Sequence, residues 1–238
     1  TVRHDAVAWG YARAADQLGV DIIQNCEVTG FRIEEGKCLG VETNLGYIGG
    51  GKIASCVAGS SGRLMAKANM RLPIESHVLQ AFVSEGLKPV LPGVITFGAG
   101  HFYCSQSDKG GLVFGGDLDG YNSYAQRGNL PVVEDVCEGA MAIFPMLGRV
   151  RLLRMWGGNM DMSMDGSSIF DRTHIKSLYF NGGWRYGGFK ATPASGWCYA
   201  HLLATDTPHE FAKAYRFDRF EKGQMIDEKG VGNNPQLH

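Results

Sequence analysis

The alternation of apolar and polar residues predicts short strands separated by a small number of helices. Apolar side chains recur near the start at helical spacing, in the order Val7, Tyr11, Ala14 and Leu18. We expect a helix there that is capped by Asp5 and ended by Gly19. Strand-like runs follow at residues 20–23, 27–33, 38–43 and 52–58, and residues 34–37 (EEGK) indicate a hairpin. This order is typical of part of an α/β domain.

The middle of the chain follows a strand pattern without a strong helical period. Runs at residues 78–83, 94–97, 102–105 and 112–115 predict an antiparallel sheet. After this sheet, Pro131 can start a helix whose apolar face contains Val133, Val136, Ala140, Ile143 and Phe144.

The last third is expected to contain three short strands and one more helix. The strands are predicted at residues 151–156, 169–170 and 178–181. The helix is expected to have Thr192 as its N-cap and Pro193 as its first residue, and to end near residue 204. In the tail we expect three aromatic side chains to pack on the body, namely Phe211, Phe217 and Phe220.

Composition and charge narrow the classes of protein to consider. The 23 Lys and Arg against 24 Asp and Glu give a net charge of −1, without the basic excess of a general nucleic-acid binder. No apolar run approaches the roughly 18 residues of a membrane span. The six cysteines stand at least 12 residues apart, without zinc-site spacing, and suit a reducing cytoplasm. Abundant glycine, 34 of 238 residues, suits tight turns or backbone close against a ligand.

Two segments partly match known ligand-binding motifs, but each lacks a residue that the motif requires. Residues 46–53 (GYIGGGKI) approach a phosphate loop, yet Ile53 has no hydroxyl for Mg²⁺, and a glycine-rich hairpin turn is favoured. Residues 161–166 (DMSMDG) resemble the start of a calcium loop, but its twelfth position is Arg172 instead of a glutamate. The dinucleotide pattern GxGxxG is absent, and the seven histidines show no metal-ligand spacing.

Four segments together resemble one family. They are residues 3–10 (RHDAVAWG), 72–77 (LPIESH), 105–110 (SQSDKG) and 187–193 (GGFKATP). They are similar to the β subunits of heterotetrameric sarcosine oxidases, which belong to the FAD-dependent amine oxidases related to D-amino-acid oxidase. The resemblance covers nearly the whole chain and corresponds to the C-terminal three-fifths of such a subunit. We therefore expect an N-terminal part upstream, where the missing GxGxxG would lie.

The resemblance implies a two-domain fold of the α/β class. A Rossmann-like FAD-binding domain, here lacking its N-terminal βαβ unit, would comprise residues 1–70 and 150–208. A substrate-binding domain of α+β type with an antiparallel sheet would be inserted as residues 71–149. Residues 209–238 would form a C-terminal tail.

The resemblance also implies an activity and partners. Sarcosine would be demethylated oxidatively at FAD to give glycine and formaldehyde, and electrons would pass to FMN, where O₂ becomes hydrogen peroxide. The implied partners are the α, γ and δ subunits, with no nucleic acid and no membrane, in the cytoplasm. Three alternatives remain open: an oxidase of another secondary or N-methyl amino acid, a non-catalytic flavin-scaffold subunit, and a fragment that is inert alone.

Candidate FAD-binding residues form two groups. Val28, Ala58 and Gly59 are one group, because a strand that ends in Ala-Gly lets backbone approach a cofactor, although ordinary strand packing explains Val28 equally well. Gly187, Gly188 and Phe189 form the other group through the resemblance. Lys190, beside a predicted helix N-terminus, would bind the substrate carboxylate, although a lysine is most often solvated. His101 and Lys109, both in the expected substrate-binding domain, are weaker candidates for a role in substrate binding.

The two flavins are expected to be held differently. The resemblance implies that His4 carries FMN covalently, although spacing alone favours an ordinary residue before a helix. FAD would be held without a covalent bond, because residues 155–170 contain no cysteine and Gly158 stands near the position where related monomeric enzymes attach it. Cys137 and Cys198 lie on predicted helices, where a buried structural role is favoured.

Overall fold

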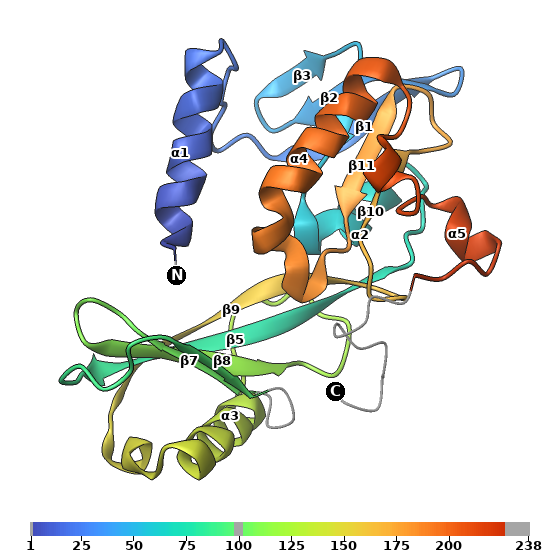
Figure 1. Ribbon diagram of the computed structural model, residues 1–238. Coiled ribbons are helices and arrows are strands. Elements are labelled where there is room, and N and C mark those ends of the chain that lie inside the picture. The colour runs from blue at the N-terminus through green and yellow to red at the C-terminus, as the bar shows by residue number, and fades with distance from the viewer. Residues whose placement is uncertain (1, 98–101, 227–238) are drawn as a thin grey trace.

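The structure is a computed structural model that describes residues 2–97 and 102–226. Figure 1 shows a five-stranded sheet between helix α3 (Leu130–Ile143) on one side and the part of the chain that carries helix α4 (Gly188–Thr205) on the other. Two three-stranded sheets accompany α4. The predicted mixture of helices and strands is therefore confirmed.

The five-stranded sheet is antiparallel, with the strand order β6-β7-β8-β5-β9. Its strands are β5 (Ile74–Gly86), β6 (Val94–Phe97), β7 (Phe102–Gln106), β8 (Gly111–Leu118) and β9 (Leu152–Ser163). One face packs on α3 through a buried apolar cluster that includes Phe82, Phe114 and Val136. The predicted antiparallel sheet is confirmed. Residues of this sheet also line the candidate site described below.

The two smaller sheets differ in their pairing. Strands β1 (Val28–Glu34), β2 (Lys37–Thr43) and β3 (Gly46–Gly49) are antiparallel, which confirms the hairpin at residues 34–37. Because residues 46–49 pair with β2, this part of the glycine run is a strand rather than the predicted turn. In the other sheet, β10 (Ile169–Arg172) is antiparallel to β11 (Leu178–Gly182), which is parallel to β4 (Ile53–Ser55).

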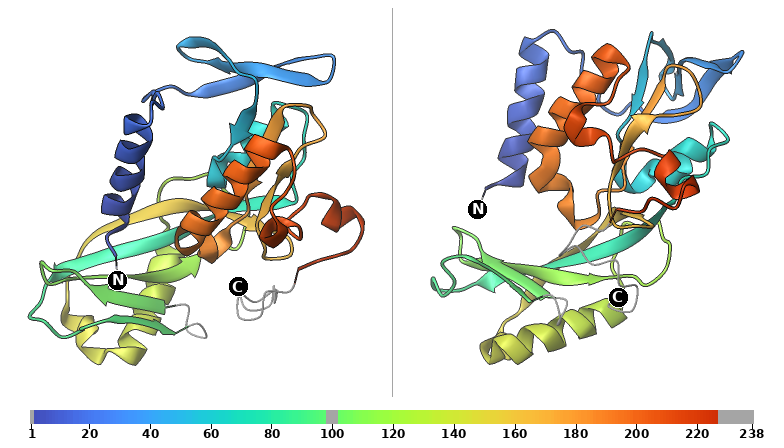
Figure 2. Two further views of the ribbon diagram at one scale, coloured as in Figure 1. Left: turned by 45° about the horizontal axis from the view of Figure 1, so that its top comes forward. Right: turned by 45° about the vertical axis from the view of Figure 1, so that its right-hand side comes forward.

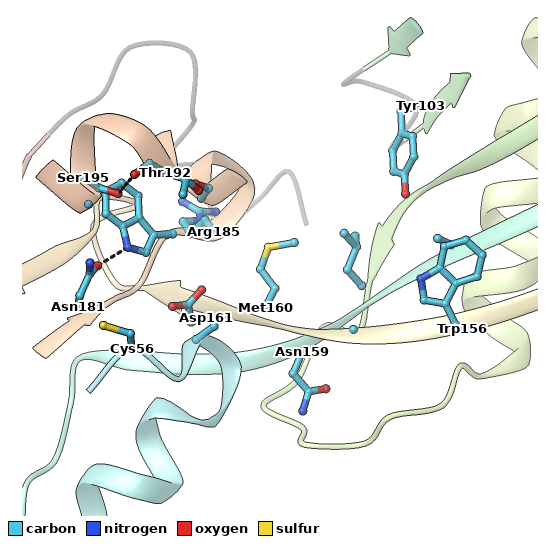
Figure 3. A pocket seen from close by; sticks show the side chains of 17 residues that line it. Cys56, Tyr103, Trp156, Asn159, Met160, Asp161, Asn181, Arg185, Thr192 and Ser195 are labelled. Atoms are coloured by element: carbon cyan, nitrogen blue, oxygen red, sulfur yellow. Dashed lines mark hydrogen bonds between the residues drawn. The ribbon is translucent and has the colours of Figure 1, made fainter. Parts of the chain in front are cut away.

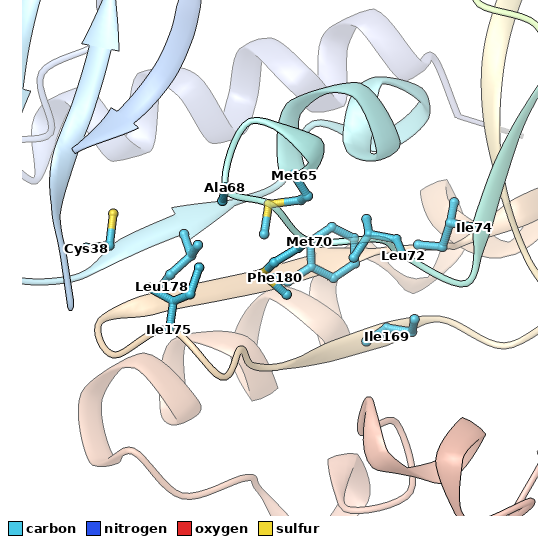
Figure 4. Close-up of a cluster of buried hydrophobic side chains, with 10 residues drawn as sticks. All are labelled: Cys38, Met65, Ala68, Met70, Leu72, Ile74, Ile169, Ile175, Leu178 and Phe180. Atoms are coloured by element: carbon cyan, nitrogen blue, oxygen red, sulfur yellow. The ribbon is translucent and has the colours of Figure 1, made fainter. Parts of the chain in front are cut away.

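Apolar side chains cover both faces of the mixed sheet β10-β11-β4. On one face, α2 (Ser61–Ala66) and the segment after it bring Met65 and Leu72 against Phe180 (Figure 4). On the other face, Leu202 of α4 belongs to the same buried cluster as Phe170. Each such fully buried side chain contributes about 1.5–3 kcal/mol to stability, so α4 is anchored through this cluster.

Helix α4 begins earlier than the sequence signals predict. Gly187 is its N-cap residue, whereas we expected Thr192 at that position and Pro193 as the first helical residue. Thr192 lies one turn inside, where its hydroxyl donates to the Gly188 carbonyl at 3.1 Å. Pro193 removes one hydrogen bond from the helix interior. Burial of the apolar face of α4 outweighs this local cost.

Helix α1 (His4–Gln17) also differs from the prediction at its start. Arg3 is the N-cap residue, and Asp5 lies in the first turn, where its carboxylate pairs with Arg3 at 2.5 Å instead of capping the helix. None of the residues of α1 is buried, and Figure 2 shows the helix standing beside the body. Residues 20–23 were predicted as a strand, but they are not in one, and they pair with none of the described strands.

The C-terminal tail contains one short α-helix among its described residues, α5 (Asp218–Glu221). Phe217 and Phe220 pack on the body, as predicted, whereas the prediction for Phe211 is wrong, because its side chain is 75% exposed. Short 3₁₀ helices complete the described chain: η1 (Ala58–Ser60), η3 (Pro145–Arg149), η4 (Arg185–Gly187) and η5 (Glu210–Ala212).

The limits of the FAD-binding and substrate-binding domains stay a prediction. Residues 150–208 were predicted to belong to the FAD-binding domain. Strand β9 lies in this range, but from Leu152 to Ser163 it pairs with β5, which lies in the predicted substrate-binding domain. Pairing alone would therefore group β9 with the five-stranded sheet.

Candidate functional site

A cleft with a volume of about 690 Å³ lies between the five-stranded sheet and the N-terminal half of α4 (Figure 3). The sheet contributes Leu79, Ala81, Tyr103, Trp156, Gly158, Asn159, Met160 and Asp161. The α4 side contributes Asn181, Trp184, Arg185, Gly188, Thr192, Ser195 and Gly196, and the end of β4 is followed by Cys56 and Ala58. The volume is in the range of about 300–1,000 Å³ that is typical of sites for small molecules and cofactors.

Strand register places two aromatic and two small residues in one row across the sheet. Tyr103 pairs with Gly115, Gly115 with Ala81, and Ala81 with Trp156. A Cβ atom at Gly115 would lie only 3.0 Å from the Tyr103 hydroxyl, so a side chain there would crowd this ring. The row forms a trough with an aromatic residue at each end.

Small side chains line the opposite wall. Gly188, Thr192, Ser195 and Gly196 recur at helical spacing on the face of α4 that lines the cleft. Such residues let a flat ligand come close to the helix backbone. The first turn of α4 also carries the partial positive charge of a helix N-terminus, which favours an anionic group nearby.

Two hydrogen bonds hold the turn that leads into this wall. The buried carboxylate of Asp161 accepts the Gly183 N–H at 2.5 Å. The Trp184 indole N–H donates to Asn181 Oδ1 at 2.6 Å. Gly183 has a φ of +76°, which glycine adopts at little cost. The β11–α4 turn is therefore tied to strand β9 and to the end of β11.

Burial favours the neutral forms of three side chains that line the cleft. It raises the pKa of Tyr103, so this hydroxyl keeps its proton at neutral pH and can donate a hydrogen bond. Desolvation also raises the pKa of the Cys56 thiol, which disfavours the nucleophilic thiolate. Burial raises the pKa of Asp161, opposed by the Gly183 N–H.

The sequence-predicted FAD residues are only partly brought together. Ala58 and Gly188 line the cleft, and Gly187 directly precedes α4. Val28 is half-buried at the start of β1, outside the lining. Gly59 is buried against β9 rather than open to the cleft, because a Cβ atom there would lie 2.5 Å from Asn159 Cβ. The roles of these residues stay predictions.

The remaining candidates lie outside the cleft lining. Phe189 and Lys190 are exposed in the first turn of α4. His4 is the exposed first residue of α1, beside a separate hollow of about 360 Å³ that includes Arg3 and Arg13. Lys109 is exposed between β7 and β8, and His101 lies outside the described residues.

Among the residues that line the cleft and that sequence reasoning missed are Tyr103, Trp156 and Asp161. Strand alternation could assign Tyr103 and Trp156 to strand faces, but only the register shows that they share one row. The partner of Asp161 is a backbone N–H, which has no sequence signal at all.

Two kinds of feature are absent from the described part of the chain. Residues 2–97 and 102–226 contain no group of three or more His, Cys, Asp or Glu side chains placed to hold a metal ion. Over the same residues, every helix is too short or too polar to cross a bilayer.

Comparison with known proteins places the fold in a family. The family model for FAD dependent oxidoreductases matches residues 1–202. The chain belongs to the FAD-dependent oxidoreductase family. This family is the one that the amino-acid sequence resembles, and the predicted fold class is confirmed. The cleft between sheet and α4 is thus the candidate flavin site of a family member.

Curated relatives resemble the chain over almost all of its length. It is 69% identical over 238 residues to sarcosine oxidase subunit beta of Rhizobium meliloti (strain 1021), which covers 100% of this chain and 57% of that protein. It is 47% identical over 229 residues to sarcosine oxidase subunit beta of Arthrobacter sp, with coverages of 96% and 56%. The chain therefore spans somewhat more than half the length of these relatives.

Solved structures show the same architecture. The crystal structure of L-proline dehydrogenase from P. horikoshii is similar with a TM-score of 0.81 and 28% identity, over 91% of this chain and 59% of that chain. Glycine oxidase from Geobacillus kaustophilus has a TM-score of 0.77 at 16% identity, over 87% and 56%. The second likeness concerns the fold alone.

Proposed function

We propose that this chain is part of the β subunit of a heterotetrameric sarcosine oxidase, which converts sarcosine to glycine, formaldehyde and hydrogen peroxide with FAD and FMN. The identity of 69% with sarcosine oxidase subunit beta of Rhizobium meliloti carries this proposal. The other subunits would be α, γ and δ. A second candidate is an oxidase of another secondary amino acid, favoured by the likeness to L-proline dehydrogenase at 28% identity.

The cleft fits a flat flavin ring. Ala58 and Gly188 stand on its lining, and the small residues of α4 leave the helix backbone accessible. Together with Gly187 and Phe189, they are the residues that would hold the isoalloxazine of FAD, while Val28 and Gly59 would support the strand ends nearby. When bound, FAD supplies the acceptor for a hydride from the substrate. The positive end of α4 would stabilise negative charge on the ring.

The chain's own residues would bind and shield the substrate. Tyr103 and Trp156 present aromatic surface on the sheet side, which excludes water from the reacting atoms. The Tyr103 hydroxyl, neutral through burial, can donate a hydrogen bond to a substrate oxygen. Lys190 would approach the substrate carboxylate from the first turn of α4.

The activity is tested on the full-length protein produced with its partner subunits. We expect hydrogen peroxide and formaldehyde to be formed from sarcosine. The rate of hydrogen peroxide formation is compared at equal concentrations of sarcosine, L-proline and glycine. Higher kcat/KM for L-proline would favour the second candidate. Absence of oxidation of any of these amines by a flavin-loaded complex would favour a non-catalytic scaffold and contradict the proposal.

Lys190→Met is expected to lower kcat/KM for sarcosine about 10- to 100-fold, mainly through KM, because a charge-assisted bond to the carboxylate is lost. Steady-state kinetics of the full complex measure this change. Lys213→Met, which removes an exposed lysine after η5, is the control and should leave kcat/KM unchanged. An unaltered kcat/KM in Lys190→Met would remove the assignment.

Acid precipitation of the full-length complex is expected to release FAD into the supernatant and to leave FMN bound to the precipitated protein. After tryptic digestion of the pellet, FMN is expected on the peptide that contains His4. The exposed His4 imidazole can reach a flavin bound beside α1, and Arg3 and Arg13 supply cations for its phosphate. Mass spectrometry measures both flavins. His4→Ala should retain FAD and lose covalent FMN. FAD on the pellet, or FMN on another residue, would contradict this assignment.

A further inference from the structure

Asp161 is a buried carboxylate at the point where the five-stranded sheet meets the turn before α4. It is 4% exposed, lies near the end of β9 and lines the cleft. Its carboxylate accepts the Gly183 N–H at 2.5 Å, and Figure 3 shows the side chain pointing from the sheet toward the segment that carries Arg185. A carboxylate that is taken out of water is costly unless hydrogen bonds compensate it. Packing alone therefore does not account for an aspartate at this position.

The N-terminal half of α4 has little burial of its own to hold it in place. The buried residues of this helix are Cys198, Tyr199 and Leu202, which all lie in its C-terminal half. Gly188 and Gly196, which line the cleft, lie on the part of the helix before the first of these buried residues. The position of this half is therefore set largely by the turn that precedes it.

Trp184 and Asp161 both hold that turn, but they tie it to different parts of the fold. The indole of Trp184 donates to Asn181 Oδ1 at 2.6 Å and stacks on Phe170 with ring centroids 5.7 Å apart, which ties the turn to β10 and β11. Asp161 instead reaches the turn from β9, which is paired with β5 in the five-stranded sheet. The bond between Asp161 and Gly183 therefore fixes the turn relative to the other wall of the cleft.

We propose that Asp161 is a positioning residue that holds the N-terminal half of α4 in place for binding FAD. The proposal rests on FAD in this cleft, as in the proposed function, but not on the identity of the amine. The acting group is a carboxylate oxygen that accepts a backbone N–H which would otherwise be buried without a partner. Without this bond the turn can move away from β9, and the contacts that Gly187 and Gly188 would make with FAD are weakened.

The test compares variants of the full-length complex by the Kd of FAD, measured by equilibrium dialysis with chromatographic quantification of bound FAD. Asp161→Leu removes the acceptor at similar size and is expected to raise the Kd at least about tenfold. Asp161→Asn keeps an acceptor oxygen and is expected to stay within about threefold of the wild type. Asp161→Ala lacks the acceptor but leaves room for a water molecule, so it should fold even where leucine does not, and raise the Kd by a smaller factor than leucine.

Ser84→Ala is the matched control for loss of stability. Ser84 is buried on β5 outside the cleft lining, and its hydroxyl accepts the Leu112 N–H at 2.9 Å. Alanine there leaves another backbone N–H of the same sheet without this partner. The midpoint of thermal unfolding is therefore expected to fall, as in Asp161→Leu, while the Kd of FAD stays unchanged. All Kd values are measured at one temperature well below the lowest of these midpoints.

The outcomes distinguish the role of Asp161 from the proposed function. An unchanged Kd in the leucine and alanine variants would overturn the role, and so would a Kd in Asp161→Asn as high as in Asp161→Leu, because the charge rather than the acceptor would then matter. An equal rise in Ser84→Ala would also overturn it, because FAD binding would then follow stability alone. The expected order of Kd values in a complex whose wild type oxidises no sarcosine would support the role of Asp161 and contradict the proposed function.

Discussion

Replacing Arg219 with methionine is expected to lower the free energy of unfolding by about 3–5 kcal/mol. The guanidinium is 2% exposed and pairs with Asp165 at 2.7 Å and 2.9 Å, and it also donates to the Ser167 carbonyl at 2.7 Å. These bonds tie α5 to the turn between β9 and β10. Methionine would leave the carboxylate of Asp165 buried without its counter-ion, which is the costly half of a broken buried pair.

The pH dependence of this effect follows from Asp165. Burial by itself raises the pKa of this carboxyl, but Arg219 and backbone N–H groups outweigh burial and hold the pKa below its ordinary value. A lowered folded-state pKa gives stability that is complete above the unfolded-state pKa of about 3.9 and is lost as the pH falls through the folded-state value. We expect the wild-type and Arg219→Met free energies of unfolding to differ fully at pH 7 and to converge below about pH 4.

Denaturant unfolding of the full-length protein measures this difference. Lys222→Met is the control, because it removes an exposed ion pair with Asp218 and should cost at most about 0.5 kcal/mol. In the double variant Asp165→Asn with Arg219→Met, part of the lost stability should return, because no buried charge is left unpaired. Equal costs for Arg219→Met and Lys222→Met would contradict the prediction.

Gly59→Ala is expected to lower the free energy of unfolding by about 1–3 kcal/mol, and Gly59→Val by more. A Cβ atom at Gly59 would lie 2.5 Å from both Cβ and the backbone oxygen of Asn159, and the backbone of β9 cannot move aside cheaply because β9 is paired with β5. Gly59→Val should also weaken FAD retention, since the adjacent Ala58 lines the cleft.

The control for this steric argument is Gly51→Ala. A Cβ atom at Gly51 meets no atom within 4 Å, so alanine there should leave stability unchanged or raise it slightly. Thermal unfolding and the flavin content after gel filtration are measured on the same samples. If Gly59→Ala were as stable as Gly51→Ala, the packing of η1 on β9 would be misassigned. If Gly59→Val retained FAD fully, the cofactor role of Gly59 would be refuted.

Several elements of the fold were predictable because their signals are local. The hairpin at residues 34–37 follows from a turn sequence between two strand-like runs, and the structure forms β1 and β2 there. Helix α3, predicted to start at Pro131, starts one residue earlier and has the expected apolar face at helical spacing, and the Asn129 side chain caps it by accepting the Val132 N–H. Such features need only neighbours in sequence.

Local signals failed where distant contacts outweighed them. Thr192 and Pro193 are strong start signals, yet α4 starts at Gly188 because the turn before it is tied to Asp161. The run at residues 20–23 has strand character but finds no partner strand among those described. Phe211 is apolar but remains exposed, because burial depends on what lies opposite a side chain.

The sequence by itself predicted the α/β class and the antiparallel strands, and of the segment at residues 187–193 that it singled out, Gly188 and Thr192 line the cleft. Only the tertiary structure decided which side chains meet in the cleft. Tyr103 and Trp156 share a row because β7, β8, β5 and β9 pair in one register, and Arg185 lines the opposite wall because a buried carboxylate holds its turn. The physical reason is that periodicity and turn chemistry act between sequence neighbours, whereas register and burial depend on residues far apart in the chain.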